Sequence, residues 1–181
     1  MTRPIDIAVV GATGLVGEAF LKLIEKKNVP VGQAKLFASE KSEGLSRMVG
    51  GKSRPIESLT PGCFDGLQLV FFSSGEEVSR QWAPEAVRAG AYAIDNSSAF
   101  RMDPKTSLIV PEVNPQAIPS KPAIIANPNC STIQLVVALN ALKGFGLQSV
   151  RVASYQAASG AGKLAQQELV EHTALGADGD L

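Results

Sequence analysis

The chain has 181 residues, a formal net charge of zero and a hydrophobic fraction of 45%, so it can form one core, or one domain and part of another. Its basic residues form no block or aromatic-interleaved stripe, so nothing suggests a nucleic acid or a polybasic membrane contact. The sequence begins with neither a signal-peptide pattern nor a membrane span. Two cysteines, Cys63 and Cys130, and one histidine, His172, provide neither a disulfide framework nor a metal-ligand spacing. We therefore expect a cytoplasmic protein, in a reducing setting, with no metal.

A glycine-rich turn lies near the start of the sequence. Residues 5–10 form an apolar run typical of a buried strand, and residues 18–27 form an amphipathic segment typical of a helix. In such a strand, turn and helix, the first glycine permits a tight turn, the second lets a pyrophosphate approach, and the third allows close packing. A glycine triplet alone can be a bare packing turn, but the context on both sides favours dinucleotide binding. The residues assigned to it are Gly11, Thr13, Gly14, Leu15, Val16 and Gly17.

The loop after the second expected strand, residues 34–38, bears on the choice of cofactor. An NAD-selective fold places an acid at the end of this strand to bind the ribose 2′-hydroxyl, and this chain has Ser39 there. With Lys41 and Ser42 nearby, a 2′-phosphate would meet hydroxyls and one cation, which favours NADP over NAD. Two glutamates in the same loop weaken this argument, and the alternative is a solvated loop of mixed charge.

Strands and helices alternate through the middle of the chain. Residues 45–66 are expected to be irregular around a short edge segment, because glycine and proline punctuate them. The apolar run at 67–72 predicts a strand buried on both faces, and it ends in small residues, Ser74 among them, that would line the cofactor crevice. A helix over 77–89 and a strand over 91–94 follow. The alternation predicts a Rossmann-like, doubly wound, mostly parallel α/β sheet.

A polar loop at 95–101 ends in Arg101. In a doubly wound sheet this loop lies beside the crevice, where the forked guanidinium can bind a phosphate or a carboxylate. The alternative is a surface salt bridge.

Cys130 lies where an apolar run at 123–126, a predicted strand, gives way to a predicted helix over 131–142. A thiol at a helix start faces unpaired backbone N–H groups and the positive end of the helix dipole, which favour the thiolate and can hold an oxyanion. The alternative is a small buried residue that begins a core helix. A strand over 148–153 and a helix over 164–174 are predicted to follow.

Five stretches carry a resemblance to a known family. They are the motif at 11–17, Asp-Asn-Ser-Ser-Ala-Phe-Arg at 95–101, Pro-Glu-Val-Asn at 111–114, Asn-Pro-Asn-Cys-Ser-Thr at 127–132, and Ser-Tyr-Gln-Ala-Ala-Ser-Gly-Ala-Gly at 154–162. In this order they closely resemble aspartate-β-semialdehyde dehydrogenase. The resemblance implies an NADP-dependent oxidoreductase that interconverts aspartate β-semialdehyde plus phosphate with β-aspartyl phosphate through a cysteine thioester. That reaction leads toward lysine, threonine, methionine and diaminopimelate, and the intact enzymes are dimers or tetramers.

The resemblance also implies roles for individual residues. Cys130 matches the nucleophile, and Gln156 matches the residue that orients the substrate. Arg101 matches the arginine that receives the phosphate, with Asn129 as its partner. The residues that match cofactor contacts are the three glycines of the motif, Thr13, Ser39, Ser42, Ser159 and Gly160.

The chain departs from the family in its length. Family members continue for about as many residues again, and that part supplies an arginine for the substrate carboxylate and a histidine as acid-base catalyst. His172 lies outside any family motif, and we interpret it as a surface or packing residue. We therefore expect an amino-terminal portion: an NADP-binding domain over 1–127 and the beginning of an α+β catalytic and dimerisation domain over 128–181. Alone, it should bind NADP weakly and turn over little substrate.

Two other functions stay open at this point. One is a related acyl-phosphate reductase such as N-acetyl-glutamyl phosphate reductase, against which the sequences around Cys130 and at 154–156 argue. The other is a non-catalytic nucleotide-binding or subunit-interaction module made from a truncated dehydrogenase.

Overall fold

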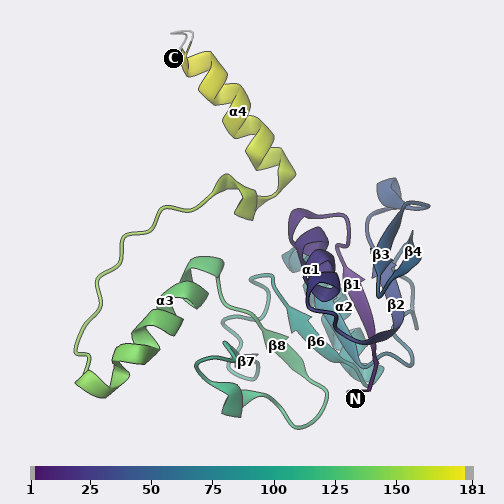
Figure 1. The fold of residues 1–181 in the computed structure, drawn as a ribbon, viewed down its shortest axis with the longest axis horizontal. Coiled ribbons are helices and arrows are strands. Elements are labelled where there is room, and N and C mark those ends of the chain that lie inside the picture. Colours follow the sequence, from purple (N-terminus) through teal and green to yellow (C-terminus); the bar gives the residue numbers. More distant parts are fainter. Residues whose placement is uncertain (1–2, 178–181) are drawn as a thin grey trace. The chain divides into compact units, whose positions relative to one another are not determined.

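The computed structural model describes residues 3–177, within which eight strands form one sheet in the order β3-β4-β2-β1-β5-β6-β8-β7 (Figure 1). The strands are β1 (Ile5–Val10), β2 (Val31–Phe37), β3 (Ser46–Val49), β4 (Lys52–Glu57), β5 (Leu69–Phe72), β6 (Tyr92–Asp95), β7 (Ser107–Leu108) and β8 (Ile124–Ala126). The helices are α1 (Leu15–Lys26), α2 (Glu76–Arg88), α3 (Cys130–Leu142) and α4 (Lys163–Ala177). Neighbouring strands are parallel except β3 and β4, which are antiparallel. The expected Rossmann-like, mostly parallel sheet is confirmed.

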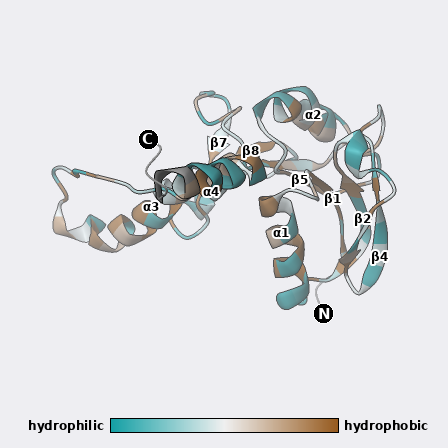
Figure 2. Cartoon of the chain, turned by 90° about the horizontal axis from the view of Figure 1, so that it is seen from above, coloured by the Kyte–Doolittle hydropathy of each residue, from teal (hydrophilic) through white to brown (hydrophobic). Residues whose placement is uncertain are grey.

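The central strand β1 buries both of its faces. Ala8 and Val10 belong to a core cluster that includes Ala83 of α2, whereas Val9 belongs to a second cluster that includes Leu21 of α1. Because successive side chains of a strand point to opposite faces, one apolar strand needs a helix on each side of the sheet. Figure 2 shows α1 and α2 on these opposite sides.

The strand order places a topological switch point beside β1. The chain continues from β1 to β2 on one side, while β5 pairs with β1 on the other. Open α/β sheets bind ligands at the carboxyl ends of the strands that flank such a point. Gly11 follows β1 and Ser73 follows β5, so the glycine loop lies at this position.

Residues 45–66 contain more regular structure than the sequence indicates. Strands β3 and β4 form a hairpin in which Val49 is opposite Lys52. Gly50 and Gly51 connect them, with φ angles of 61° and 71°. Positive φ at both central residues is the pattern of a two-residue hairpin turn, and glycine adopts it without strain. The expected short edge segment is thus a two-stranded hairpin, and the expected irregular structure is confined to residues 58–66.

The strand expected over 148–153 is also wrong. The structure has no strand there, and Val150 and Val152 are exposed. An extended segment becomes a strand only where a neighbour exchanges backbone hydrogen bonds with it. The second unit, as far as it is described, contains no strand that could do so.

The chain divides into two compact units, Met1–Leu147 and Gln148–Leu181. The first contains the sheet and helices α1 to α3, and the described part of the second contains a short 3-10 helix (Ala158–Ala161) and α4. This boundary differs from the expected one after residue 127, because α3 groups with the sheet. The assignment of 128–181 to an α+β catalytic domain stays a prediction. None of the helices in the described part of the chain is long and apolar enough to cross a membrane.

Candidate functional site

Two glycines of the loop, Gly11 and Gly17, are packed so closely against backbone that neither position has room for a side chain. A Cβ on Gly17 would lie 2.1 Å from the carbonyl oxygen of Gly11, and a Cβ on Gly11 would lie 2.8 Å from the backbone carbon of Ser73. Gly11 also has a φ angle of 88°, a conformation that glycine tolerates and larger residues avoid. The loop therefore brings the start of α1 directly against the carboxyl ends of β1 and β5.

The start of α1 has the properties of an anion site. Gly14 is its N-cap and provides no side-chain hydrogen bond, while the amide of Glu18 makes the first helical bond to the Gly14 carbonyl. The amides of Leu15, Val16 and Gly17 precede that bond, so they have no partner within the helix. Unpaired N–H groups and the positive helix end attract a phosphate. These three amides and the glycine backbone before them thus form a cradle of the kind that accepts a phosphate group.

The loop after β2 reaches this cradle through a pair of hydroxyls. The hydroxyl oxygens of Thr13 and Ser42 lie 3.3 Å apart, which joins the glycine loop to the 3-10 helix Glu40–Ser42. Ser39 is the N-cap of that short helix, and Ser39 and Lys41 are exposed. Ser74 is exposed in the loop after β5. The Thr13–Ser42 contact therefore fixes the loop after β2 to the glycine loop, while the cofactor roles of Ser39, Lys41 and Ser74 stay predictions.

Arg101 is held by backbone carbonyls at the ends of two strands. Its Nε donates to the carbonyl of Asn127 at 2.9 Å, and its Nη2 donates to the carbonyl of Asn96 at 3.1 Å. Asn96 follows β6 and Asn127 follows β8. The alternative of a surface salt bridge is therefore wrong, because no carboxylate within residues 3–177 pairs with this guanidinium. Its positive charge stays available to an anion at the carboxyl edge of the sheet.

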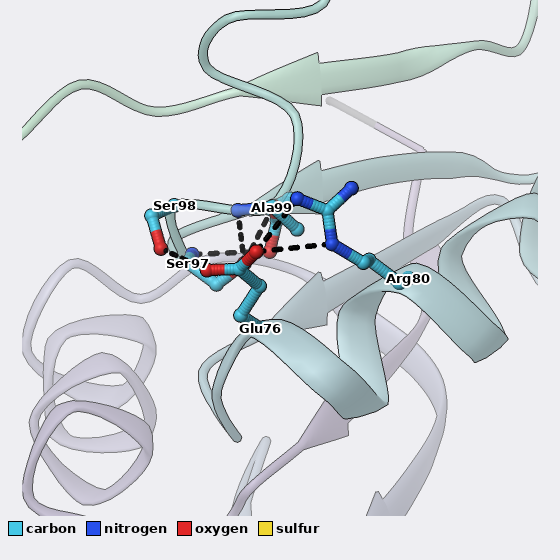
Figure 3. Close-up of polar contacts among 6 residues, drawn as sticks. Glu76, Arg80, Ser97, Ser98 and Ala99 are labelled. Atoms are coloured by element: carbon cyan, nitrogen blue, oxygen red, sulfur yellow. Dashed lines mark hydrogen bonds and ion pairs between the residues drawn. The ribbon is translucent and has the colours of Figure 1, made fainter.

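The loop that carries Arg101 is anchored at two further points. The fully buried Asp95 accepts hydrogen bonds from the amide and hydroxyl of Ser97 at 3.0 and 2.9 Å. On the other side, the Ser98 hydroxyl donates to Glu76 at 2.7 Å, and Arg80 donates to the other oxygen of Glu76 at 2.6 Å (Figure 3). The Ser98 hydrogen bond first, then Arg80, lowers the pKa of Glu76 below its ordinary value. The loop is thus fixed to the start of α2.

Cys130 is the first residue of α3, and it is exposed. Asn129 caps the helix by accepting a hydrogen bond from the amide of Ser131 at 3.0 Å. Helix α3 contains no buried residue in this structure, and Cys130 itself is exposed, so the alternative of a buried cysteine finds no support in this portion of the chain. The role of Cys130 stays a prediction. The thiol is accessible at the carboxyl end of β8.

The glycine loop, Arg101 and Cys130 thus follow β1, β6 and β8, which are parallel strands of one sheet. Residues 6–121, which include the first two of these features, match the family described as semialdehyde dehydrogenase, NAD binding domain. The chain belongs to this family.

Individual relatives extend the similarity of this semialdehyde dehydrogenase chain beyond residue 121. The aspartate-semialdehyde dehydrogenase of Aquifex aeolicus (strain VF5) is 46% identical over 177 residues, which cover 96% of this chain and 52% of the relative. The crystal structure of aspartate semialdehyde dehydrogenase II from Vibrio cholerae, complexed with ASA, has a TM-score of 0.90 and 41% identity over 98% of this chain and 54% of that one. The structure of the Candida albicans enzyme with NADP has a TM-score of 0.69 and 27% identity, over 80% and 48% of the two chains. The chain spans about half the length of the curated relatives it matches.

Three residues that the semialdehyde dehydrogenase resemblance places in the site belong to the second unit. Gln156 is exposed in the segment before the 3-10 helix Ala158–Ala161, and Ser159 and Gly160 lie within that helix. Their roles stay predictions. His172 is exposed on α4, in agreement with its interpretation as a surface residue.

Sequence reasoning missed the residues that hold the predicted ones in place. The sequence assigns no role to the side chains of Asn96, Asn127 and Glu76, and it predicts only that Ser73 lines the cofactor crevice, yet these four residues hold Arg101, the glycine loop and the loop at 95–101. The sequence does carry one signal for the two asparagines, since each stands directly after an apolar strand. A polar residue at that position faces the ligand edge of a parallel sheet.

Proposed function

We propose that this chain is the nucleotide-binding and nucleophile-bearing portion of an NADP-dependent aspartate-semialdehyde dehydrogenase, a cytoplasmic homo-oligomer. The observation that supports this most is the arrangement along one sheet edge: a dinucleotide cradle after β1, an anion-binding arginine after β6 and an exposed cysteine after β8. Three inter-strand steps separate β1 from β8, roughly 14 Å at about 4.8 Å per step. A cofactor bound across the switch point can therefore extend toward the cysteine.

Cys130 would act as the nucleophile. Its Sγ forms a bond to the acyl carbon of β-aspartyl phosphate, the bond from that carbon to the phosphate oxygen breaks, and phosphate leaves with the electron pair. Arg101 neutralises the charge on the departing phosphate. The nicotinamide, when bound, supplies the hydride that reduces the resulting thioester to the aldehyde. Release of the aldehyde restores the Cys130 thiolate.

NADP is the proposed form of the nicotinamide cofactor. Ser39 at the carboxyl end of β2, together with Ser42 and Lys41, offers donors to a 2′-phosphate, and no carboxylate occupies the position of Ser39 itself. The Candida albicans relative, whose structure includes NADP, supports this choice.

The 181-residue chain by itself should carry out only part of this reaction. It contains the proposed nucleophile, but the one histidine of its sequence, His172, lies outside every motif that resembles the family and is exposed on α4. We therefore propose that the chain binds NADP and accepts an acyl group but turns over little aspartate semialdehyde, because proton transfer and recognition of the substrate carboxylate need further residues.

Acyl transfer to the purified chain tests this function directly. Incubation with β-aspartyl phosphate, followed by peptide mapping in the mass spectrometer, should show an aspartyl thioester on Cys130 that Cys130→Ser removes and Cys63→Ser retains. N-acetyl-glutamyl phosphate in a parallel reaction should give less adduct. Labelling of Cys63 instead, or faster acylation by the second phosphate, would contradict the proposal. A steady-state assay with aspartate semialdehyde, phosphate and NADP should give little turnover.

A further inference from the structure

The two asparagines that follow β6 and β8 form a side-chain pair across the sheet edge. Asp95 of β6 is in register with Ala126 of β8, so Asn96 and Asn127 are the next residues along parallel neighbours. The Nδ2 of Asn127 donates to the Oδ1 of Asn96 at 2.6 Å, and both side chains are half-buried. The backbone ladder continues through them, because the amide of Asn127 donates to the Asp95 carbonyl at 2.8 Å and the amide of Asn96 donates to the Phe72 carbonyl at 3.0 Å.

The same two residues hold the guanidinium of Arg101, but through their carbonyl oxygens. Nε and Nη2 form one edge of the planar guanidinium, and this edge is directed at the two carbonyls. The described residues provide no further hydrogen-bond acceptor for Arg101, so the end formed by Nη1 and the second Nη2 proton stays available. A guanidinium held in this way presents that end as a fork that matches two oxygens of a phosphate.

We propose that the Asn96–Asn127 amide pair is a positioning device for Arg101. Each carbonyl that holds the guanidinium belongs to a residue whose side chain is in the pair. Fixing the two side chains therefore fixes the two acceptors and, through them, the direction of the free end. A long side chain that is free in the unbound protein loses much rotamer freedom when it binds an anion. An arginine that two carbonyls already hold loses less, so it binds the anion more tightly. This inference rests on the proposed phosphate-binding role of Arg101, and it gives the amide pair a role in anion affinity.

Inorganic phosphate and the Nε–H resonance of Arg101 provide the test on the whole 181-residue chain. In the unaltered chain this proton should exchange slowly with water, because it is bonded to the Asn127 carbonyl. Its NMR signal is assigned by its loss in Arg101→Gln. Phosphate should shift the signal and should protect Cys130 from alkylation, and Arg101→Gln should abolish the protection.

Removing the side-chain amide of either asparagine should make the Arg101 side chain more mobile, although both backbone carbonyls remain. Asn127→Ala and Asn96→Ala should broaden the Nε–H signal and weaken phosphate binding at least tenfold. Asn96→Asp keeps an acceptor for Nδ2 of Asn127, so it should retain the slowly exchanging signal. Asn140→Ala, on an exposed position of α3, is the matched control and should change neither quantity. Circular dichroism establishes that each variant is folded, and the exchange rate in the unaltered chain tests the inference even where a variant unfolds.

The possible results separate this inference from the proposed function. If Arg101→Gln loses phosphate while both alanine variants bind it as tightly as the unaltered chain, the positioning role is wrong and the role of Arg101 stands. Fast exchange of the Nε proton in the unaltered chain also overturns the positioning role. If Arg101→Gln still binds phosphate, or the unaltered chain does not, the anion role of Arg101 is wrong and the inference fails with it.

Discussion

Gly17 lies so close to Gly11 that a Cβ on Gly17 would stand 2.1 Å from the Gly11 carbonyl oxygen. The obstructing atom belongs to the backbone, so no side-chain rotation relieves the contact. The close packing of α1 against the turn after β1, and hence the position of the anion-binding amides, depends on this glycine.

We expect Gly17→Ala to lower the free energy of unfolding by about 1–3 kcal/mol, the usual cost of overpacking, and to weaken NADP binding more than tenfold. Urea denaturation and calorimetric titration measure the two effects. Gly144→Ala is the matched control, because a Cβ at Gly144 would meet nothing within 4 Å. Equal stability and affinity of the two variants would contradict this account of the loop.

Ser79→Ala should stabilise the protein. Ser79 is fully buried on α2, and its hydroxyl has no hydrogen-bond partner among the described residues. Removing an unsatisfied buried hydroxyl, and placing alanine inside a helix, should raise the free energy of unfolding by about 1 kcal/mol.

Removal of the Ser97 hydroxyl should instead lower the free energy of unfolding. The Ser97 hydroxyl donates to the buried Asp95 at 2.9 Å and accepts from the amide of Ala99 at 3.1 Å. We expect Ser97→Ala to cost about 1–3 kcal/mol. Thermal unfolding of the Ser79→Ala and Ser97→Ala variants measures both changes in stability. A loss of stability in Ser79→Ala would show that the Ser79 hydroxyl has a partner in solution.

The sequence predicted the sheet well because β1 and β5 are apolar runs with turn signals on both sides. The hairpin of β3 and β4 was missed because its strands are polar and mostly exposed, so only the Gly50–Gly51 turn marks it. The glycine turn after β1 and the position of Cys130 at the start of α3 could be predicted because both follow from local chain order. The bonds of Arg101 to Asn96 and Asn127 could not be predicted, because they depend on the lateral register of β6 and β8.

Ser39→Asp should shift the cofactor preference from NADP toward NAD. A carboxylate at the carboxyl end of β2 can accept hydrogen bonds from a ribose 2′-hydroxyl, and it repels a 2′-phosphate. We expect the ratio of NADP to NAD affinity to fall at least tenfold, measured by fluorescence titration with each nucleotide. Ser46→Asp adds the same charge at an exposed position of β3 and should leave the ratio unchanged. A higher affinity for NAD in the unaltered chain would overturn the NADP assignment.

The two cysteines should differ in reactivity near neutral pH. Cys130 is exposed, whereas Cys63 is half-buried, and burial raises its pKa above the ordinary value. Iodoacetamide should therefore label Cys130 first, and labelling of Cys63 should need higher pH. Peptide mapping of timed samples gives the two rates, with the Cys130→Ser and Cys63→Ser variants as references. Faster labelling of Cys63 would show that Cys130 is not the more reactive thiol.

The raised pKa of Cys63 also makes stability depend on pH. The folded state favours the neutral thiol, so the stability linked to it is fully present below the unfolded pKa of about 8.5 and is lost as pH rises through the folded value. Urea denaturation at successive pH values should show a loss above about pH 8.5 that Cys63→Ala removes. A loss of equal size in Cys63→Ala would assign the effect to other groups.

Glu76 should report the attachment of the loop at 95–101 to α2. Hydrogen bonding from Ser98, and then Arg80, lowers the pKa of Glu76, so the carboxylate is favoured in the folded state. The stability linked to this contact is present above the unfolded pKa of about 4.3 and is lost as pH falls through the folded value. A carbon-13 NMR titration of the Glu76 carboxyl should give a pKa below the ordinary glutamate range. Ser98→Ala should move that pKa upward, and Arg80→Gln, which removes both a hydrogen bond and a positive charge, should also move it upward. An unchanged pKa in Ser98→Ala would mean that the loop is not bonded to α2 in solution, and that Arg101 depends on the strand ends alone for its position.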